Sequence, residues 1–371
     1  MDLSGYFARF RANTMAGSGN QSWFRPESAE KEITGRVFYR VFAGGEYNWS
    51  PLFSDAVFTT FADGSHSHAN QTLGGWRVCS ARIGVTGRAE MEGFAEPERM
   101  LPLTFAGKRD YRPAAGETFF ADPIALRVEK GAYICLETTV CGERIPCHPE
   151  SLLPAFVRTQ DGWTHSTDLL FTAMLGCDRP ARMRVGFLGD SITQGIGTQP
   201  NAYLHWNAVL AEKLGADYAF WNLGLGYARA SDAASDGVWL ELARQNDAVF
   251  LCLGVNDLYH AALSAETLKQ NLLRTVRGLK EAGVSVLVQT IPPFEYEGER
   301  REIWLQVNGW IRETLAREAD AVFDNVPVLG RSAEEPFYSR YGGHPDERGC
   351  AAWAEALEPA ARRFLENITK G

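Results

Sequence analysis

Long apolar runs are absent from this sequence, and no stretch approaches the roughly 18–20 consecutive apolar residues that a membrane-spanning helix needs. Basic residues are in the minority, because 37 Lys and Arg stand against 46 Asp and Glu and leave a formal net charge of −9. Nucleic acids and anionic membranes are bound through basic patches, so we expect neither as a partner. Residues 1–19 contain no basic head followed by an apolar core, as a secretory signal would, and we therefore expect a cytoplasmic protein.

Cysteine is scarce and scattered, with seven residues in a chain of 371. An odd number without regular spacing argues against a disulfide framework and favours reduced, buried thiols. The tightest group, Cys141, Cys147 and His148, lacks the second ligand pair that a zinc site requires. We therefore expect no metal.

The first half of the chain has the period of β-structure. Residues 36–42 (RVFYRVF) and 123–129 (PIALRVE) alternate between apolar and polar side chains, and residues 133–140 (YICLETTV) are rich in β-branched and aromatic types. Short strands at close spacing indicate a sandwich or jelly roll. We expect an all-β domain in residues 1–178.

The pattern changes after residues 176–183 (GCDRPARM), which we take as the domain boundary. Short apolar runs now alternate with segments of helical spacing, such as 265–281 with Ser264 as its N-cap. Strands buried on both faces and separated by helices predict a parallel, doubly wound α/β sheet in residues 179–371. The four apolar runs are MRVGFLG (183–189), YAFWNLG (218–224), AVFLCLG (248–254) and VSVLVQTIPP (284–293).

The glycines that follow the first of these runs do not form a phosphate-binding loop. Gly189, Gly195 and Gly197 do not have the G-x-G-x-x-G spacing, and they lead to Thr198-Gln199-Pro200 without the lysine of a P-loop. We therefore expect no nucleotide cofactor.

Ser191 is instead a candidate nucleophile, because it stands where a strand passes into a helix. A serine hydroxyl needs a histidine to remove its proton, and donors to stabilise the oxyanion that its attack creates. Functional residues of doubly wound sheets gather beyond the carboxyl ends of the strands, and His344 falls on that edge. The other histidines are His66, His68, His148 and His165 in the β domain, His205 in the first helix and His260 after the third strand.

Four segments together resemble the blocks of the SGNH/GDSL hydrolase superfamily. They are GDSI (189–192), NLGLGY (222–227), GVND (254–257) and HP (344–345), and the resemblance covers about residues 183–366. It implies a flavodoxin-like sheet and ester hydrolysis through an acyl-serine. Carried over by position, Ser191 is the nucleophile, His344 the base and Asn256 a side-chain donor to the oxyanion. The backbone N–H groups of Ser191 and of a second-block residue complete the oxyanion hole.

Two positions depart from the family pattern. The second block usually ends in a glycine where this chain has Tyr227, so Gly224, Gly226 or Tyr227 is the backbone donor; we predict Gly226, because glycine allows close approach. The family commonly has Asp three residues before the histidine, and here that residue is Tyr341. His344 must then be oriented by a main-chain carbonyl or a more distant acid, as in superfamily members that use a Ser–His dyad.

The order of the domains resembles that of two-domain carbohydrate acetylesterases, which implies an oligosaccharide ester as substrate. No amphipathic lid segment is visible, which favours a short acyl group, and residues 294–302 (FEYEGERRE) are predicted to border the entrance. An intracellular lysophospholipase or acyl thioesterase, and an inactive carbohydrate-binding homologue, are the alternatives. Candidate sugar-stacking residues in the β domain, each also explicable as packing, are Trp23, Trp49, Trp76 and Trp163.

Overall fold

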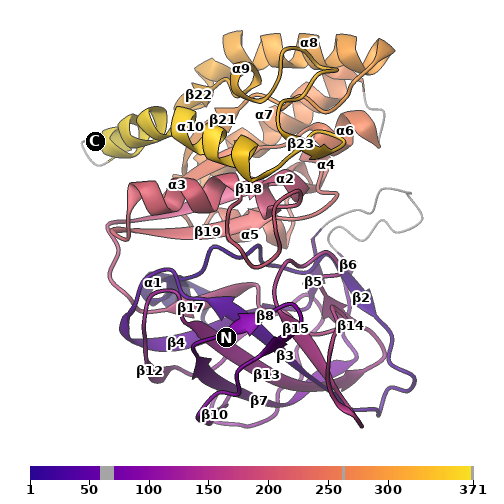
Figure 1. Ribbon diagram of the computed structural model, residues 1–371, viewed down its shortest axis with the longest axis vertical. Coiled ribbons are helices and arrows are strands. Elements are labelled where there is room, and N and C mark those ends of the chain that lie inside the picture. The colour runs from indigo at the N-terminus through magenta and orange to yellow at the C-terminus, as the bar shows by residue number, and fades with distance from the viewer. Residues whose placement is uncertain (59–70, 261–263, 369–371) are drawn as a thin grey trace. The chain divides into compact units, whose positions relative to one another are not determined.

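The computed structural model describes residues 1–58, 71–260 and 264–368. The chain divides into two compact units (Figure 1). Unit 1 takes in Met1–Phe58 and Asn70–Pro180, and unit 2 takes in Ala181–Gly371. Within the described ranges, no helix is long and apolar enough to cross a membrane.

Unit 1 is built from antiparallel sheets, as its alternating sequence predicts. A six-stranded sheet has the order β10 (Met100–Leu103), β7 (Trp76–Thr86), β13 (Tyr133–Gly142), β3 (Ile33–Arg40), β15 (Ala155–Thr159) and β16 (Gly162–His165). A five-stranded sheet has the order β1 (Arg11–Ala12), β17 (Met174–Cys177), β4 (Gly45–Ser54) and β11 (Thr118–Phe120), with β12 (Ile124–Val128) also paired to β4. The shorter elements are α1 (Leu3–Arg9) and the strand pairs β2 (Ser22–Phe24) with β14 (Ile145–Cys147), β5 (Ala56–Val57) with β6 (Gln71–Thr72), and β8 (Ala89–Glu90) with β9 (Gly93–Phe94).

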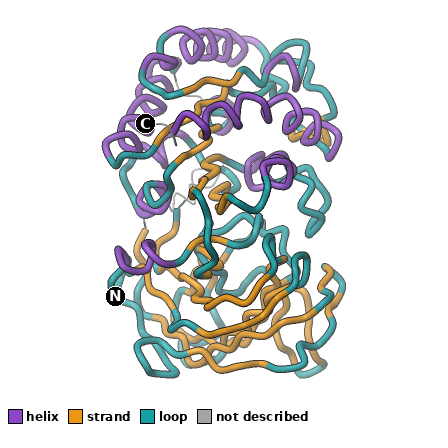
Figure 2. The backbone as a smooth tube through the Cα atoms, turned by 90° about the vertical axis from the view of Figure 1, so that its left-hand side faces the viewer, coloured by secondary structure: helices purple, strands orange, loops and turns teal. Residues whose placement is uncertain are grey.

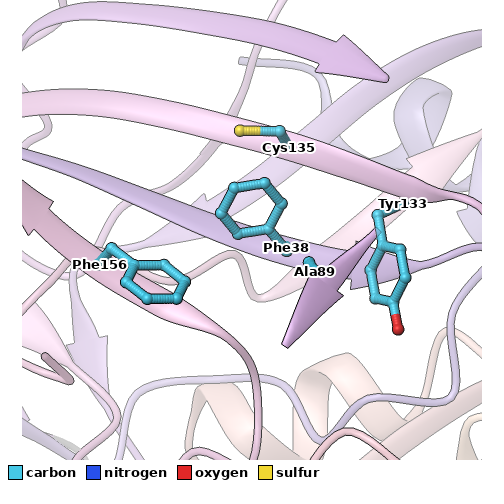
Figure 3. Close-up of a cluster of buried hydrophobic side chains, with 5 residues drawn as sticks. All are labelled: Phe38, Ala89, Tyr133, Cys135 and Phe156. Carbon is cyan, nitrogen blue, oxygen red and sulfur yellow. The ribbon is translucent and has the colours of Figure 1, made fainter. Parts of the chain in front are cut away.

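The core of unit 1 takes up two of the four tryptophans that were candidates for sugar stacking, while Trp23 and Trp163 are half-buried. Trp49 and Trp76 are completely buried, so the expectation that they could stack on a sugar is wrong. Trp163 packs against a cluster of buried side chains, drawn in Figure 3, and the Arg36 guanidinium lies 4.4 Å from its ring centroid. Large aromatic side chains bury much apolar area, which favours the core over the surface. The cluster consists of Phe38, Ala89, Tyr133, Cys135 and Phe156.

Unit 2 contains a parallel five-stranded sheet, which confirms the predicted α/β fold. Its order is β19 (Tyr218–Gly224), β18 (Met183–Gly189), β20 (Ala248–Cys252), β21 (Ser285–Gln289) and β22 (Ala321–Phe323). This is the flavodoxin-like order, in which the second strand lies on one side of the first and the later strands lie on the other. All four predicted runs are strands of this sheet, and they are almost entirely buried, as parallel strands covered on both faces are.

Apart from α1, the helices that the structure describes all belong to unit 2 (Figure 2). The predicted helix at 265–281 is α7 (Ala265–Glu281), and the Ser264 hydroxyl caps it by accepting a hydrogen bond from the Thr267 N–H. Its buried face includes Leu268, Leu272 and Val276, which are spaced to line one side of a helix. The other helices are α2 (Ser191–Gln194), α3 (Trp206–Leu214), α4 (Ala230–Ala234), α5 (Val238–Ala243), α6 (Val255–Tyr259), α8 (Gly298–Glu313), α9 (Val326–Leu329) and α10 (Glu347–Ile368), with a 3₁₀ turn at Leu315–Arg317.

Candidate active site

Ser191 is the first residue of α2, directly after β18. The Asp190 carboxylate caps this short helix, accepting a hydrogen bond of 3.0 Å from the Ile192 N–H. A β-carbon added at Gly224 would lie 2.2 Å from the backbone nitrogen of Gln194, so only glycine allows β19 to approach α2 this closely. Because β19 and β20 lie on opposite sides of β18, Ser191 stands at the switch point of the sheet, where such folds bind ligands.

His344 lies against the serine although 153 residues separate the two in sequence. The Oγ atom of Ser191 is 2.8 Å from Nε2 of His344, and Nδ1 of His344 is 3.2 Å from the carbonyl oxygen of Tyr341. A carbonyl can only accept, so this hydrogen-bond network assigns the proton to Nδ1. Nε2 therefore keeps its lone pair and accepts the hydrogen bond from the serine hydroxyl.

A tight hairpin places the Tyr341 carbonyl at this position. The strands β23 (Ser339–Tyr341) and β24 (His344–Pro345) are joined by Gly342 and Gly343, with φ angles of 54° and 88°. Two positive φ angles in a two-residue loop are the signature of a type I′ turn, for which Gly-Gly is a favoured sequence. The turn pairs Tyr341 with His344. Tyr341 stands where the family commonly has an aspartate. The turn brings the main-chain carbonyl of Tyr341 to the histidine, at the place that the aspartate carboxylate would otherwise take.

The surroundings of His344 keep its imidazole neutral. Burial lowers the pKa of His344 to about 4, and the hydrogen bond to the Tyr341 carbonyl opposes this only in part. The Phe294 ring lies edge-on to the imidazole with centroids 4.9 Å apart, and the Tyr341 ring lies 4.6 Å away. Among the described residues, no carboxylate accepts a hydrogen bond from His344. A neutral imidazole with a free lone pair is the form that can remove a proton.

Asn256 follows β20 as the second residue of α6 and is buried. Its side-chain Nδ2 donates a hydrogen bond of 3.0 Å to the carbonyl oxygen of Ala228, in the loop after β19. An amide nitrogen carries two hydrogens, so this bond leaves one donor for another acceptor. The next residue, Asp257, accepts a hydrogen bond of 2.9 Å from the Ala230 N–H and holds the same two segments together. The predicted role of Asn256 at an oxyanion stays a prediction.

In the second block, the residue with positive φ is Tyr227 (φ 60°), at the position where the family usually has its last glycine. Gly224 of the same block makes a close approach to α2. Gly226 is buried in the turn that follows β19. Its predicted role as a backbone donor is untested.

Among the described residues, no other histidine hydrogen-bonds to Ser191. His148 and His165 belong to unit 1, and His66 and His68 fall in the segment that is not described. His205 is the N-cap residue of α3, and its Nδ1 atom hydrogen-bonds to Oδ1 of Asn207. The structure describes no group of three or more His, Cys, Asp or Glu side chains that could hold a metal.

Sequence reasoning missed one neighbour of His344, the Phe294 ring. The segment 294–302 was predicted only to border the entrance, from its position after a strand end. An aromatic residue directly after Pro292-Pro293 was the available signal, but nothing in the sequence indicates that its ring meets a histidine 50 positions later.

Comparison with known proteins supports the resemblance carried by the four blocks. Residues 187–352 match the model of the GDSL-like Lipase/Acylhydrolase family. No curated protein sequence shows a significant match to the chain.

Three solved structures are among those similar to this chain. A family two carbohydrate esterase from Cellvibrio japonicus is 11% identical, with 96% of each chain covered and a TM-score of 0.41. A family two carbohydrate esterase from Clostridium thermocellum, in complex with cellohexaose, is 12% identical, with 96% of this chain and 99% of that chain covered and a TM-score of 0.40. A carbohydrate esterase family 3 structure from Talaromyces cellulolyticus is 16% identical, with 50% of this chain and 98% of that chain covered and a TM-score of 0.38.

The four sequence blocks, the parallel sheet that carries them and the match to the family model agree with one another. Residues 187–352 are thus similar to the GDSL-like lipase/acylhydrolase family, whose model they match.

Proposed function

We propose that this protein is a serine esterase that removes short acyl groups, chiefly acetyl, from carbohydrates. The observation that carries the proposal is the 2.8 Å contact between Oγ of Ser191 and Nε2 of His344, with Nδ1 of His344 held by the Tyr341 carbonyl. This arrangement has a nucleophile, a base and a group that orients the base.

The proposed reaction proceeds through an acyl-serine. Nε2 of His344 takes the proton of the Ser191 hydroxyl while Oγ attacks the ester carbonyl carbon. The resulting oxyanion accepts hydrogen bonds from the second N–H of the Asn256 amide and from the backbone N–H groups of Ser191 and Gly226. His344 then protonates the departing sugar oxygen as the ester C–O bond breaks. A water molecule then attacks the acyl-serine while His344 takes its proton. His344 gives that proton to Oγ of Ser191 as the acyl C–Oγ bond breaks, which releases the carboxylic acid and restores the serine hydroxyl.

The intact contact between serine and histidine favours catalysis over the alternative of a homologue that only binds carbohydrate. A chain that had lost its activity would be under no constraint to keep a neutral imidazole with its lone pair toward a serine hydroxyl. The main-chain carbonyl fixes the tautomer, as a carboxylate would. It stabilises the transient imidazolium less than a full negative charge does.

The burial of the two reacting groups favours a short acyl group over the long chain of a lysophospholipid or acyl thioester. Ser191 is 9% exposed and His344 is 8% exposed, and the Phe294 ring closes one edge of the imidazole. A long acyl chain would need an extended apolar surface beside the serine.

A panel of p-nitrophenyl esters tests the proposal. We expect acetyl to be hydrolysed faster than butyryl, and butyryl faster than octanoyl. Ser191→Ala should lower the rate on the acetyl ester by a factor on the order of 10⁶. The matched control is Ser80→Ala, an exposed serine of β7, which should leave the rate unchanged. A wild-type protein as slow as Ser191→Ala would favour the binding-only alternative, and a large preference for octanoyl would favour the lysophospholipase or thioesterase.

Acetate release from acetylated oligosaccharides then tests the carbohydrate part of the proposal. We expect acetate to appear with wild type and not with Ser191→Ala. Hydrolysis of p-nitrophenyl acetate without release of acetate from any oligosaccharide would contradict a carbohydrate substrate while leaving the esterase assignment intact.

A further inference from the structure

A series of ring contacts within unit 2 leads away from the imidazole of His344. The Phe294 ring lies 4.9 Å from it, the Tyr259 ring lies 5.4 Å from Phe294, and the His260 ring lies 5.0 Å from Tyr259. Phe294 is buried, Tyr259 is half-buried and His260 is exposed, so the series runs from the catalytic pair to solvent. The end of α6 therefore lies two ring contacts from His344, a distance that one or two sugar units can span.

Arg300 stands at the exposed end of this series. Its Cζ atom lies 5.1 Å from the centroid of the Tyr259 ring, in a cation–π contact. It belongs to the first turn of α8, where the helix dipole disfavours a cation. The adjacent Arg301 forms ion pairs with Glu302 and Glu334, whereas no carboxylate of the described residues pairs with Arg300. Helix stability does not account for an unpaired, exposed guanidinium at this position.

A second hydrogen-bonding group, the His260 imidazole, lies close to the charge of Arg300. The pKa of His260 is lowered, first by burial and then by the positive charges of Arg229 and Arg300, and no carboxylate offsets them. Arg229 also acts on the Asp257 carboxyl, where it opposes the rise in pKa that burial causes, so Arg300 is the positive charge here that no carboxylate of the described residues pairs. An unpaired positive charge at an exposed position can attract an anion.

We propose that Tyr259, His260 and Arg300 form a subsite for a carboxylate on the substrate, so that the esters cleaved are those of acidic sugars such as uronic acid units. This inference rests on the proposed function and names its substrate class. The Arg300 guanidinium lies against the Tyr259 ring, and within the part of the chain that the structure describes its N–H groups donate no hydrogen bond. Those donors match the two oxygens of a carboxylate in plane, which is the strong bidentate geometry. His260 adds a further donor beside them.

Binding of three monosaccharides to the Ser191→Ala protein tests the subsite without relying on catalysis. The probes are galacturonic acid, galactose and galactose 6-phosphate, measured by isothermal titration calorimetry. We expect galacturonic acid to bind at least tenfold more tightly than galactose, since a charge-assisted hydrogen bond is lost with the neutral sugar. Adding Arg300→Gln should remove that difference. Arg274→Gln, which neutralises an exposed arginine on α7, is the control and should retain it.

The outcomes separate this inference from the proposed function. Equal affinity for galacturonic acid and galactose, or a difference that survives Arg300→Gln, would overturn the subsite. Tighter binding of galactose 6-phosphate than of galacturonic acid would overturn the assignment to a carboxylate. If wild type fails to hydrolyse p-nitrophenyl acetate while galacturonic acid still binds through Arg300, the esterase proposal fails and the anion subsite stands.

Discussion

Nδ1 of His344 is hydrogen-bonded to the main-chain carbonyl of Tyr341, its partner across the two-residue hairpin loop. The histidine and the group that orients it are therefore separated by only two glycines. In this arrangement the conformation of the loop, rather than the chemistry of a side chain, determines the tautomer of the imidazole.

Gly343→Ala should disrupt that arrangement. A β-carbon at Gly343 would lie 2.6 Å from Cα of Phe294 and 2.7 Å from the carbonyl oxygen of Pro293, at a φ of 88°. We expect the variant to lose about 1–3 kcal/mol in free energy of unfolding and at least about tenfold in kcat/KM on p-nitrophenyl acetate, because the histidine shifts. The control is Gly309→Ala in α8, where an added β-carbon meets nothing within 4 Å and should stabilise the helix by about 0.5–1 kcal/mol. An active, stable Gly343→Ala protein would contradict the role assigned to the turn.

On the acid side of its pH profile, kcat/KM should decrease only at an unusually low pH. We call this decrease the acid limb. Burial lowers the pKa of His344 to about 4, so its Nε2 lone pair is lost only below that pH. Protonated imidazole cannot accept the serine proton, and activity should therefore fall as pH decreases through about 4 rather than through the usual histidine range near 6.5. The measurement is kcat/KM on p-nitrophenyl acetate between pH 3.5 and 8, with circular dichroism to show that the fold persists. A limb near pH 6–7 would contradict the effect of burial.

Tyr341→Asp should move that limb to higher pH. A carboxylate close to the imidazole favours its charged form and typically raises a histidine pKa by about 1–3 units. Tyr341→Phe keeps both the ring and the main-chain carbonyl, and its acid limb should stay where the wild-type limb lies. If kcat/KM falls at the same acidic pH in Tyr341→Asp and in Tyr341→Phe, a carboxylate at this position does not change the pKa of His344, and the prediction is wrong.

Asp257→Asn should flatten the dependence of stability on pH. Burial raises the pKa of Asp257 to about 7, so the folded protein holds this proton more tightly than the unfolded chain does. The stability that this proton contributes is complete below about pH 4 and is lost as pH rises through 7. Urea unfolding gives the free energy of unfolding at pH 5 and at pH 8. We expect its decrease between pH 5 and pH 8 to be smaller in the variant than in wild type, by about 1–3 kcal/mol. Glu281→Gln, on the exposed side of α7, should keep the wild-type dependence, and an unchanged dependence in Asp257→Asn would contradict the prediction.

Much of the candidate active site could be predicted because its signals are local. The apolar runs that end at Gly189, Gly224 and Gly254 contain strands of one parallel sheet, and the polar residues after them lie at its carboxyl edge. Burial on both faces requires continuous apolar runs, which are visible in a single sequence. The roles of Asn256 and Gly226 remain predictions, because a backbone or amide donor is recognised only against the oxyanion that it binds.

Other features depend on contacts between residues far apart in the chain. Trp49 and Trp76 belong to the core of unit 1, and the sequence does not distinguish an aromatic side chain on the inner face of a sheet from one that faces solvent. The contacts of Phe294 with His344 and of Arg300 with Tyr259 join separate loops and helices whose approach no local pattern encodes.

The sequence by itself determined the α/β and all-β halves and the positions of Ser191 and His344 after strands, because hydrophobic period and turn residues act over a few neighbours. Only the tertiary structure decided what orients the imidazole. The Gly342–Gly343 loop must adopt positive φ angles and pack against Phe294 before the Tyr341 carbonyl can reach Nδ1. That packing, and the burial that keeps His344 neutral, exist only once distant segments have assembled.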